Sequence, residues 1–426
     1  MNGKKVFGLL MTMLILSSVV AACATPTPQI IEKEVVVREE VPVTVEVEKE
    51  VVVEKKVIET VEVEKEVVVE KVVTPTPEPK PELAATIRVD GLSDRSAEYF
   101  DRIILKPFAA EMGVEIELVA GTYGQQGEWL AAIKAAPGEY CIATYISDFG
   151  LYNGISEGLL QPLRLENIPN YSNLADRWEN RVFVEGDENA YNVPTSMGMY
   201  TFVYAKDNIS EQPDSYAPLF DPQYADRIAL RDYGLYRIFQ TAAYLGLDPN
   251  NLSEVEVDLI FETMTEQRDL ARAYWQSSSQ LNQLLANREV WVADYWFDSI
   301  TMPREDGTNL MGELDIGWWF PKEGGPVWVG GMAIAAGCEG LQRYTAELLL
   351  NYLLEPEVYT EWAAASSYIP AIETDLYDEA AFFAKTPYVR LYRDAILNTG
   401  ILLDVATVLA NQDEWNERYE EMKLGK

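Results

Sequence analysis

The feature that most restricts how this chain can fold is the stretch 24–82, which contains no glycine and no aromatic residue. It consists almost entirely of Val, Glu, Lys, Pro and Thr, and the block EKEVVV begins at Glu32, Glu48 and Glu64. The 16-residue period keeps one face apolar if the chain is extended, but a lone ribbon without partners cannot bury that face. We therefore predict that 23–82 is a stalk, with self-association into a coil or ribbon as the alternative.

Cys23 lies at the start of the stalk, directly after a segment typical of secretory signals. Lys4 and Lys5 precede the apolar run 6–20, and small residues stand immediately before Cys23. The run is too short to span a membrane comfortably. A cysteine in this position resembles a bacterial lipobox, whose thiol is acylated before cleavage; the alternative is an ordinary signal peptide with an incidental cysteine. We predict a lipoprotein signal peptide over 1–22 and an extracytoplasmic protein anchored to the membrane by lipid on Cys23.

The composition of the whole chain excludes several classes of function. There is no histidine, which removes imidazole metal sites and Ser-His-Asp or Cys-His nucleophiles. Asp and Glu number 69 against 34 Lys and Arg, so a nucleic-acid partner is not expected. The acidity fits either solubility outside the cell or a cationic ligand. Beyond Cys23 only Cys141 and Cys338 remain, as one disulfide or as two buried thiols. We expect no metal, no cofactor and no catalytic residue.

The roughly 340 residues after the stalk are enough for two domains. Strand-like and helical patterns alternate along them. Strands are predicted at 86–90, 114–120, 140–146, 227–230, 289–296, 317–320 and 326–335. Helices are predicted at 99–112, 128–135, 149–160, 235–245, 255–273, 341–354 and 405–423. This order favours an α/β fold with open, mainly parallel sheets, and ligands in such folds bind at the carboxyl ends of strands. We predict one lobe from 83–206 plus 297–336, a second from 207–296 plus 337–426, and a ligand cleft between them.

Several short motifs in this part of the chain occur in a characteristic order. They include SEGLLQPL at 156–163, NIPN at 167–170, YNVP at 191–194, PDSY at 213–216, DPQY at 221–224, LGLDPN at 245–250, PKEGG at 321–325 and LLEPEV at 353–358. In this order and spacing the chain resembles the polyamine-binding branch of bacterial extracellular solute-binding proteins, the partners of ABC importers. The resemblance covers about 84–375 and implies a two-lobe periplasmic-binding-protein-like fold of type II that closes on its ligand and docks on a permease.

The resemblance also implies which residues contact the ligand. A Ser and an aromatic residue after the third strand match Ser147 and Phe149, with Asp148 between them. A Trp-x-Asp segment matches Trp296 and Asp298, and a Trp in the returning strand matches Trp328. Carboxylates and aromatic faces are the groups that a flexible amine requires. For each of these aromatic residues, packing in the core is the competing interpretation.

The chain departs from the family pattern at three recognition points. The acidic pair expected after the strand at 227–230 is reduced to Asp232, which we still predict to contact the ligand, and Arg237 is added nearby. The returning strand has Trp328 but continues with two glycines in place of an aspartate, and the first strand lacks the family Trp-Thr pair near 91–93. We expect Arg237 either to pair with a ligand carboxylate, to lie in solvent, or to pair with Asp232. The identity of the solute therefore stays open.

Three functions from different classes are consistent with these observations. The leading hypothesis is a substrate-binding lipoprotein that captures a small amine-containing solute between two closing lobes and delivers it to an ABC permease. The alternatives are a surface receptor that is not coupled to transport and, with less support, an enzyme on the same fold. An enzyme would need a carboxylate pair or a cysteine nucleophile, and Cys141 lies in an apolar strand with no activating neighbour. We therefore predict that the protein is not an enzyme.

Overall fold

The computed structural model describes residues 82–426, apart from 92–93, 120–125, 176–188, 305 and 426. The predicted signal peptide 1–22, Cys23 and nearly all of the predicted stalk lie outside the described residues. Among the helices that are described, none combines the length and the apolar character needed to cross a membrane.

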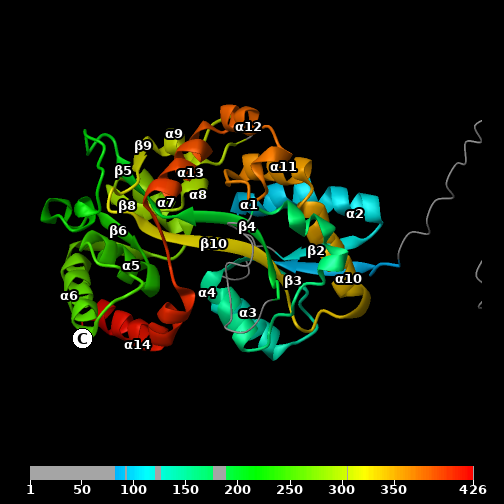
Figure 1. Cartoon of the computed structure of the whole chain (residues 1–426). Helices are drawn as coiled ribbons and strands as arrows, with labels where there is room; N and C mark the ends of the chain where they lie inside the picture. Colours follow the sequence, from blue (N-terminus) through cyan, green and yellow to red (C-terminus); the bar gives the residue numbers. More distant parts are fainter. Residues whose placement is uncertain (1–81, 92–93, 120–125, 176–188, 305, 426) are drawn as a thin grey trace, which may run out of the picture. The chain divides into compact units, whose positions relative to one another are not determined.

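The first of two sheets contains strands from both ends of the described chain (Figure 1). Its order is β11-β10-β3-β1-β2, and β4 also pairs with β10. The strands are β1 (Thr86–Asp90), β2 (Glu115–Val119), β3 (Ile142–Ser147), β4 (Asn192–Met199), β10 (Gly325–Ile334) and β11 (Gly400–Leu402). β1 is parallel to β2 and β3, whereas β10 is antiparallel to β3 and β4. The sheet is therefore mixed, because β10 returns to it from far along the chain.

The second sheet has the order β7-β6-β8-β5-β9. Its strands are β5 (Thr201–Ala205), β6 (Ile228–Arg231), β7 (Ala271–Trp275), β8 (Val292–Tyr295) and β9 (Ile316–Trp319). β6 is parallel to β7 and β8, and β5 is antiparallel to β8 and β9. Three neighbouring strands thus end at the same edge of the sheet, which is where ligands bind in open α/β sheets.

Helices connect the strands of both sheets, as the alternating pattern predicts. The α-helices are α1 (Asp94–Phe100), α2 (Lys106–Met112), α3 (Gln126–Ala135), α4 (Asp148–Ser156), α5 (Gly234–Tyr244), α6 (Glu254–Leu270), α7 (Ser278–Ala286), α8 (Phe297–Thr301), α9 (Leu310–Leu314), α10 (Gly340–Leu353), α11 (Pro356–Ser366), α12 (Glu379–Lys385), α13 (Pro387–Thr399) and α14 (Val405–Lys423). A π-helical turn, Asp101–Leu105, joins α1 to α2, so the predicted helix 99–112 is interrupted. The capping box of Ser253 and Glu256 begins α6.

The predicted lobe boundaries do not match the way in which the strands are distributed between the two sheets. The prediction places 201–205 and 316–319 in the first lobe, but β5 and β9 pair within the second sheet. It also places 337–426 in the second lobe, but α10 and α11 pack against elements of the first sheet's layer, β1 and α1. The reason is that the chain crosses between sheets at Tyr200, directly between β4 and β5, and again between β9 and β10.

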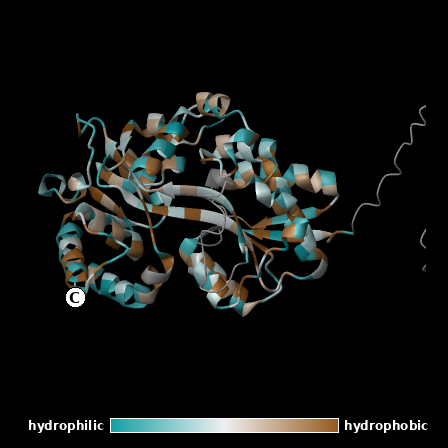
Figure 2. Cartoon of the chain, in the orientation of Figure 1, coloured by the Kyte–Doolittle hydropathy of each residue, from teal (hydrophilic) through white to brown (hydrophobic). Residues whose placement is uncertain are grey.

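The interior consists of apolar side chains from both sheets and from the helices that cover them. Hydrophobic and hydrophilic residues alternate along these helices (Figure 2). Strands β4 and β5 are buried at every residue. One hydrophobic cluster joins α4, α5, α6 and α14, with Phe149, Phe239 and Trp415 among its buried members. The C-terminal helix therefore contributes to the core and is part of the folded unit.

Cys141 and Cys338 form a disulfide, with their Cα atoms 4.7 Å apart. This settles the alternatives that the sequence leaves open, because neither residue is a free thiol. Both are buried, and the bond ties the start of β3 to the loop before α10. The backbones come close here: a Cβ on Gly337 would overlap the backbone of Gly138, so only glycine fits at that position.

We expect removal of this disulfide to destabilise the protein. The bond closes a loop with a sequence separation of 197 residues, and its loss should lower the free energy of unfolding by about 2–5 kcal/mol. Calorimetry of the wild type with and without reductant should give a lower midpoint in reductant. Cys141→Ser and Cys338→Ser should have that lower midpoint in both conditions. A wild-type midpoint that reductant leaves unchanged, together with unperturbed variants, would contradict the assignment.

Candidate ligand-binding site

Aromatic side chains from both sheets meet where the chain first crosses between them. Tyr200 stacks on Trp296 at 4.2 Å between ring centroids, and Trp296 contacts Trp328 edge to face at 5.8 Å. The ring centroids of Tyr236 and Tyr200 are 5.2 Å apart. We define the aromatic cluster as Phe149, Tyr200, Tyr233, Tyr236, Trp296 and Trp328.

Five separate parts of the fold supply these rings, and Tyr200 comes from the crossing between β4 and β5. Phe149 comes from α4 and Trp328 from β10, both in the first sheet's layer. Tyr233 is the residue before α5, Tyr236 lies in its first turn, and Trp296 directly follows β8. The cluster therefore lies at the carboxyl edge of the second sheet and touches the first. Three predicted site residues, Phe149, Trp296 and Trp328, are thereby brought together.

Half of the cluster is buried and half is partly accessible. Phe149, Tyr200 and Tyr236 are buried, whereas Tyr233, Trp296 and Trp328 keep part of their surface exposed. Burial raises the pKa of Tyr233 to about 12 and that of Tyr200 and Tyr236 well above the usual value. The phenols therefore stay neutral at physiological pH, and their faces can attract a cation.

Ser147 and Asp148 lie beside the cluster at the start of α4. Ser147 is the residue before the helix and pairs with Gly330 across the β3–β10 ladder. Asp148 is in the first turn, where a carboxylate is favoured by the helix dipole. Asp148 is half-buried, and its negative charge adds to the effect of burial in raising the pKa of Tyr236. A negative group is thus placed next to aromatic faces, as the sequence predicts.

Asp298 occupies the first turn of α8, two residues after Trp296. The hydroxyl of Tyr368 donates a hydrogen bond to its Oδ2 at 3.4 Å. Burial raises the pKa of Asp298 to about 6, although hydrogen bonds from nearby backbone amides and from Tyr368 act in the opposite direction. Burial raises the pKa of Tyr392, and the negative charge of Asp298 adds to this effect. The Tyr392 hydroxyl forms hydrogen bonds with the backbone of Met199. Asp298 can therefore change its protonation state near neutral pH.

Trp328 lies flat against the neighbouring strand because that strand has a glycine at the opposite position. Trp328 pairs with Gly198 in the β4–β10 ladder. A Cβ at Gly198 would overlap the Trp328 ring and the Tyr392 hydroxyl. Gly198 is therefore a residue that the prediction missed, and it places the Trp328 ring against Trp296.

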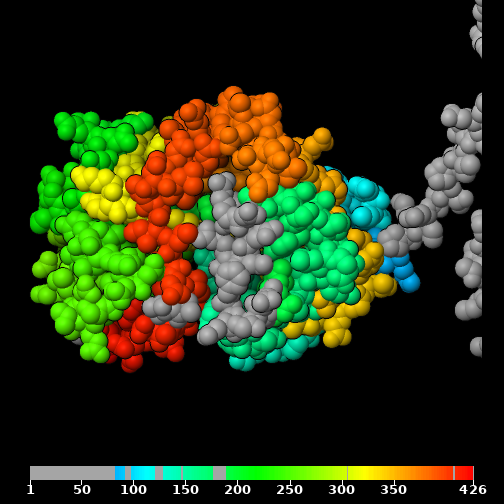
Figure 3. All heavy atoms as spheres, in the orientation of Figure 1, coloured from blue at the N-terminus to red at the C-terminus, as the bar shows by residue number. Residues whose placement is uncertain are grey.

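Asp232 is close to the cluster but is already bound within the protein. It accepts hydrogen bonds from Lys423 Nζ at 2.7 Å, from Tyr419 at 3.0 Å and from Gln276 at 2.9 Å. Burial acts to raise the pKa of Asp232, but these hydrogen bonds outweigh it, and the pKa lies below its usual value. Lys423 belongs to α14, which borders the surface of α5 and α6 (Figure 3). A lysine of the chain itself therefore already forms an ion pair with this carboxylate.

Arg237 differs from all three interpretations offered by the sequence. It is fully buried, and its Nη1 donates to Asp294 Oδ2 at 3.0 Å. Its remaining bonds go to the side-chain oxygens of Gln240 and Gln267, both at 2.6 Å. Arg237 therefore neither lies in solvent nor pairs with Asp232, and it is not available to a ligand. Its partner is 57 residues away in sequence, so local spacing could not reveal it.

Sequence reasoning also missed Tyr200, Tyr233 and Tyr236. Tyr200 belongs to no predicted element, because β4 and β5 were not recognised. Tyr233 directly precedes the start of α5 and Tyr236 lies in its first turn. Because the sequence predicts a helix here, the positions of both residues could have been predicted. The available signal was three aromatic residues next to strand ends, which the sequence alone cannot distinguish from core packing.

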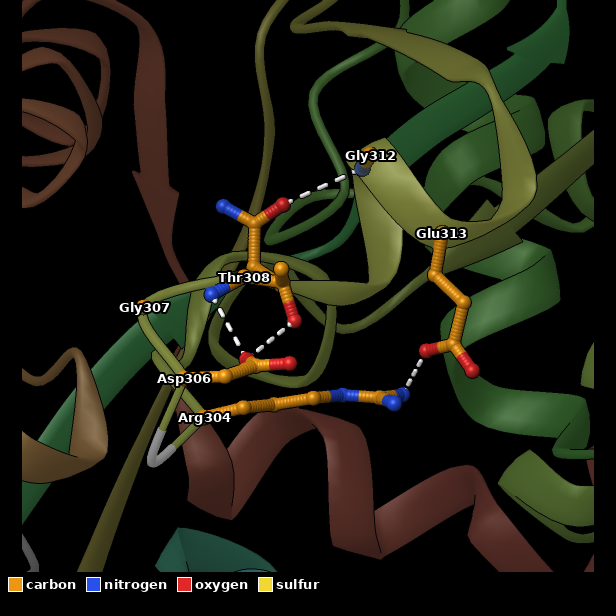
Figure 4. Close-up of a pocket in the computed structure, with 7 residues that line it drawn as sticks. Arg304, Asp306, Gly307, Thr308, Gly312 and Glu313 are labelled. Atoms are coloured by element: carbon orange, nitrogen blue, oxygen red, sulfur yellow. Dashed lines mark hydrogen bonds and ion pairs between the residues drawn. The ribbon is translucent and has the colours of Figure 1, made fainter.

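Two hollows elsewhere in the described part of the chain contain none of the predicted residues. The larger, about 550 Å³, lies between α8 and α9 and is lined by Arg304, Asp306, Gly307, Thr308, Asn309, Gly312 and Glu313 (Figure 4). Its polar groups bind one another: Arg304 pairs with Glu313, and Asp306 accepts from Thr308. The second, about 370 Å³, adjoins it near Tyr204. The described residues also contain no group of acidic or cysteine side chains suited to a metal ion.

Comparison with known proteins gives a consistent result. A sequence model described as bacterial extracellular solute-binding protein matches residues 104–388. The spermidine/putrescine-binding periplasmic protein of Salmonella typhimurium is 27% identical over 277 residues, which are 64% of this chain and 74% of that protein.

Solved structures show the same fold at lower identity. A putative spermidine/putrescine ABC transporter protein from Listeria monocytogenes superposes with a TM-score of 0.62 at 19% identity, over 80% of this chain and 100% of its own. The TpPotD lipoprotein of Treponema pallidum gives a TM-score of 0.65 at 19% identity, over 79% and 99%. The predicted two-lobe α/β fold is thereby confirmed.

We expect Asp232→Asn to lower the free energy of unfolding by about 1–3 kcal/mol, because it leaves Lys423 without its half-buried counter-charge. The folded-state pKa of Asp232 is lowered, so its contribution is fully present above the unfolded pKa of about 3.9 and disappears as the pH falls through the folded value. Denaturant titrations at several pH values should show the two proteins converging in acid.

The matched control is Asp258→Asn, which removes an exposed carboxylate that also bonds to α14, through Arg418. That change should cost at most about 0.5 kcal/mol. Equal losses in the two variants would contradict a special role for the Asp232–Lys423 pair.

Proposed function

Because this chain belongs to the bacterial extracellular solute-binding protein family, we propose that it captures an amine-containing solute at the aromatic cluster and delivers it to the permease of an ABC importer. The observation that carries this proposal is the meeting of six aromatic rings from both sheets beside Asp148 and near Asp298. One relative is a spermidine/putrescine-binding periplasmic protein, and one structural neighbour is a putative spermidine/putrescine ABC transporter protein; both names support the same proposal.

The chemistry of the cluster suits an ammonium group. Each aromatic face contributes roughly 0.5–2 kcal/mol to the binding of a cation, more where water is excluded. A carboxylate that accepts a hydrogen bond from an ammonium forms about twice as strong a bond as a neutral pair does. Asp148 and Asp298 can provide this second interaction, while the partly exposed Tyr233, Trp296 and Trp328 provide the faces.

Closure of the lobes is the proposed signal that the solute is bound. Phe149 and Trp328 belong to the first sheet's layer, and Tyr236 and Trp296 to the second. A solute that contacts rings from both layers binds the closed arrangement better than an open one, and so shifts the population toward it. Tyr200 lies at the crossing between the sheets and its ring belongs to the cluster. Its position therefore couples ligand binding to a change in the angle between the sheets at the crossing.

We further propose that the protein is held at the membrane by lipid on Cys23 and that 23–82 is the stalk that spaces the binding domain from the bilayer. The basic, apolar and small residues before Cys23 support this assignment. The structurally similar Treponema pallidum protein is itself described as a lipoprotein. Two or more acyl chains are sufficient for stable anchoring.

The binding proposal predicts a specific dependence on Trp296 and on pH. Calorimetric titration of the full chain with alkylamines and diamines should show binding, and Trp296→Ala should weaken it about tenfold by removing a cation–π partner. Affinity should rise as the pH increases through about 6, because Asp298 then loses its proton and attracts the ammonium. Asp298→Asn should abolish that rise.

The control for the aromatic change is Trp291→Ala. Trp291 is also half-buried but lies outside the cluster, against Arg227. This variant should keep the wild-type affinity. Loss of affinity in the Trp291 variant alone, or no binding by any amine, would reject the cluster as an amine site.

The anchoring proposal predicts that Cys23→Ala releases the protein from membranes. Fractionation should find the wild type in the membrane pellet and the variant in the soluble fraction, and mass spectrometry should find an acylated N-terminal peptide only in the wild type. Retention of the variant in the pellet, with no acylated peptide in either protein, would contradict lipidation.

A further inference from the structure

Arg231 is a half-buried cation at the carboxyl end of β6, at the edge where the aromatic cluster lies. Its guanidinium lies over the Trp275 ring at 4.8 Å, and Nη1 donates to the backbone carbonyls of Trp275 and Gln276. Its Nε is shielded from water and has no hydrogen-bond partner among the described residues. No ion pair between described residues includes Arg231.

An arginine without a counter-ion is unexpected in a chain with 69 acidic and 34 basic residues. A buried donor with no acceptor destabilises the folded protein. Carboxylates are close by, but both are engaged: Asp294 pairs with Arg237 and Asp232 pairs with Lys423. Arg231 therefore has no carboxylate partner among the described residues, and its Nε is an unused donor beside the site.

The start of α5 adds to this positive character. The helix has no acidic residue in its first turn, and no side chain caps it. Its unsatisfied amides carry the positive end of the helix dipole. The one acidic side chain just before it, that of Asp232, is neutralised by Lys423. This corner of the site is therefore suited to a negative group.

Charges of opposite sign act on different rings of the cluster. The positive charge of Arg231 acts on Tyr200 and Tyr233, and its side chain also hydrogen-bonds to Tyr200, so it adjoins the ring at the crossing and the ring before α5. The negative charge of Asp148 acts on Tyr236 from α4 in the first sheet's layer. A ligand that contacts these rings therefore lies near both a carboxylate and a guanidinium.

We propose that the solute carries a carboxylate as well as an amine, and that Arg231 binds the carboxylate. Nε and the adjoining Nη2 form the edge with which a guanidinium holds a carboxylate through two parallel hydrogen bonds. The amine then lies on the aromatic faces toward Asp148. The solute class is thus a small amino acid, and a diamine of the same length is disfavoured because its second ammonium meets Arg231. This inference rests on the proposed function, since it assigns the second end of the same ligand.

Calorimetric titration of the full chain can compare three series of ligands. The first contains amino acids from glycine to 6-aminohexanoate, the second the diamines of matching length, and the third the matching alkylamines. We expect at least one amino acid to bind ten times or more tighter than its diamine and its alkylamine. Arg231→Gln should weaken binding of that amino acid at least tenfold and change alkylamine affinity less than threefold. Arg231→Lys, which keeps the charge but not the two-bond edge, should recover part of the loss.

Arg227→Gln is the matched control, because Arg227 lies just before the amino end of the same strand. Like Arg231 it lies over a tryptophan, Trp291 at 5.0 Å, and donates to a backbone carbonyl, that of Glu289. This variant should bind the amino acid as the wild type does. A diamine that binds more tightly than every amino acid would overturn the inference while leaving the amine site intact. Equal losses for amino acid and alkylamine in Arg231→Gln would also overturn it, by assigning Arg231 a structural role only.

Discussion

Asp294 is the charge on which the second sheet depends. It has no exposed surface, and three donors satisfy it: Arg237 Nη1, the Trp275 indole and the backbone amide of Arg231. These bonds tie α5, β7 and β6 to β8. Removing one partner of such a pair leaves an uncompensated buried charge, at a cost of about 3–5 kcal/mol. The same bonds fix where α5 begins and where β6 ends, and therefore where Tyr236 and Arg231 lie.

The crossing between the sheets determines the other half of the site. Only Tyr200 separates β4 from β5, so the first sheet's longest pairing, β4 with β10, runs directly into the second sheet. Trp328 reaches the cluster because Gly198 offers no side chain on the opposing strand. A single glycine and a single connecting residue thus bring rings from two sheets together. The site is a consequence of the crossing, and does not belong to either sheet alone.

Much of this fold is predictable from sequence, for physical reasons that also explain the omissions. Helices α5, α10 and α14 and strands β1, β6 and β10 follow clear apolar patterns. Strands β4 and β5 do not, because they are buried on both faces and show no alternation. Strand β7 follows α6 without a break, so its residues were assigned to the predicted helix 255–273. The predicted lobe boundaries differ from the division of strands between the sheets because the chain crosses between the sheets at Tyr200 and again between β9 and β10.

The site residues divide in a similar way. Ser147, Asp148, Phe149, Trp296, Asp298 and Trp328 could be proposed because a family resemblance gave each a position. Arg237 was misread because its partner, Asp294, is distant in sequence and joined to it only by the fold.

The Asp232–Lys423 pair is a contact within the chain that resembles the contact expected between a carboxylate and a cationic ligand. A lysine from the last helical turn places an ammonium on the carboxylate at the start of α5, with the Tyr419 ring beneath it at 5.0 Å. A carboxylate and an aromatic face are the same groups that would hold the ammonium of a ligand. With that position taken by the chain itself, the negative charge is cancelled, and the nearby Arg231 is left as the dominant charge at this edge. We therefore propose a ligand with one cationic and one anionic end, because Asp148 and Arg231 are the charges that act on the rings of the aromatic cluster.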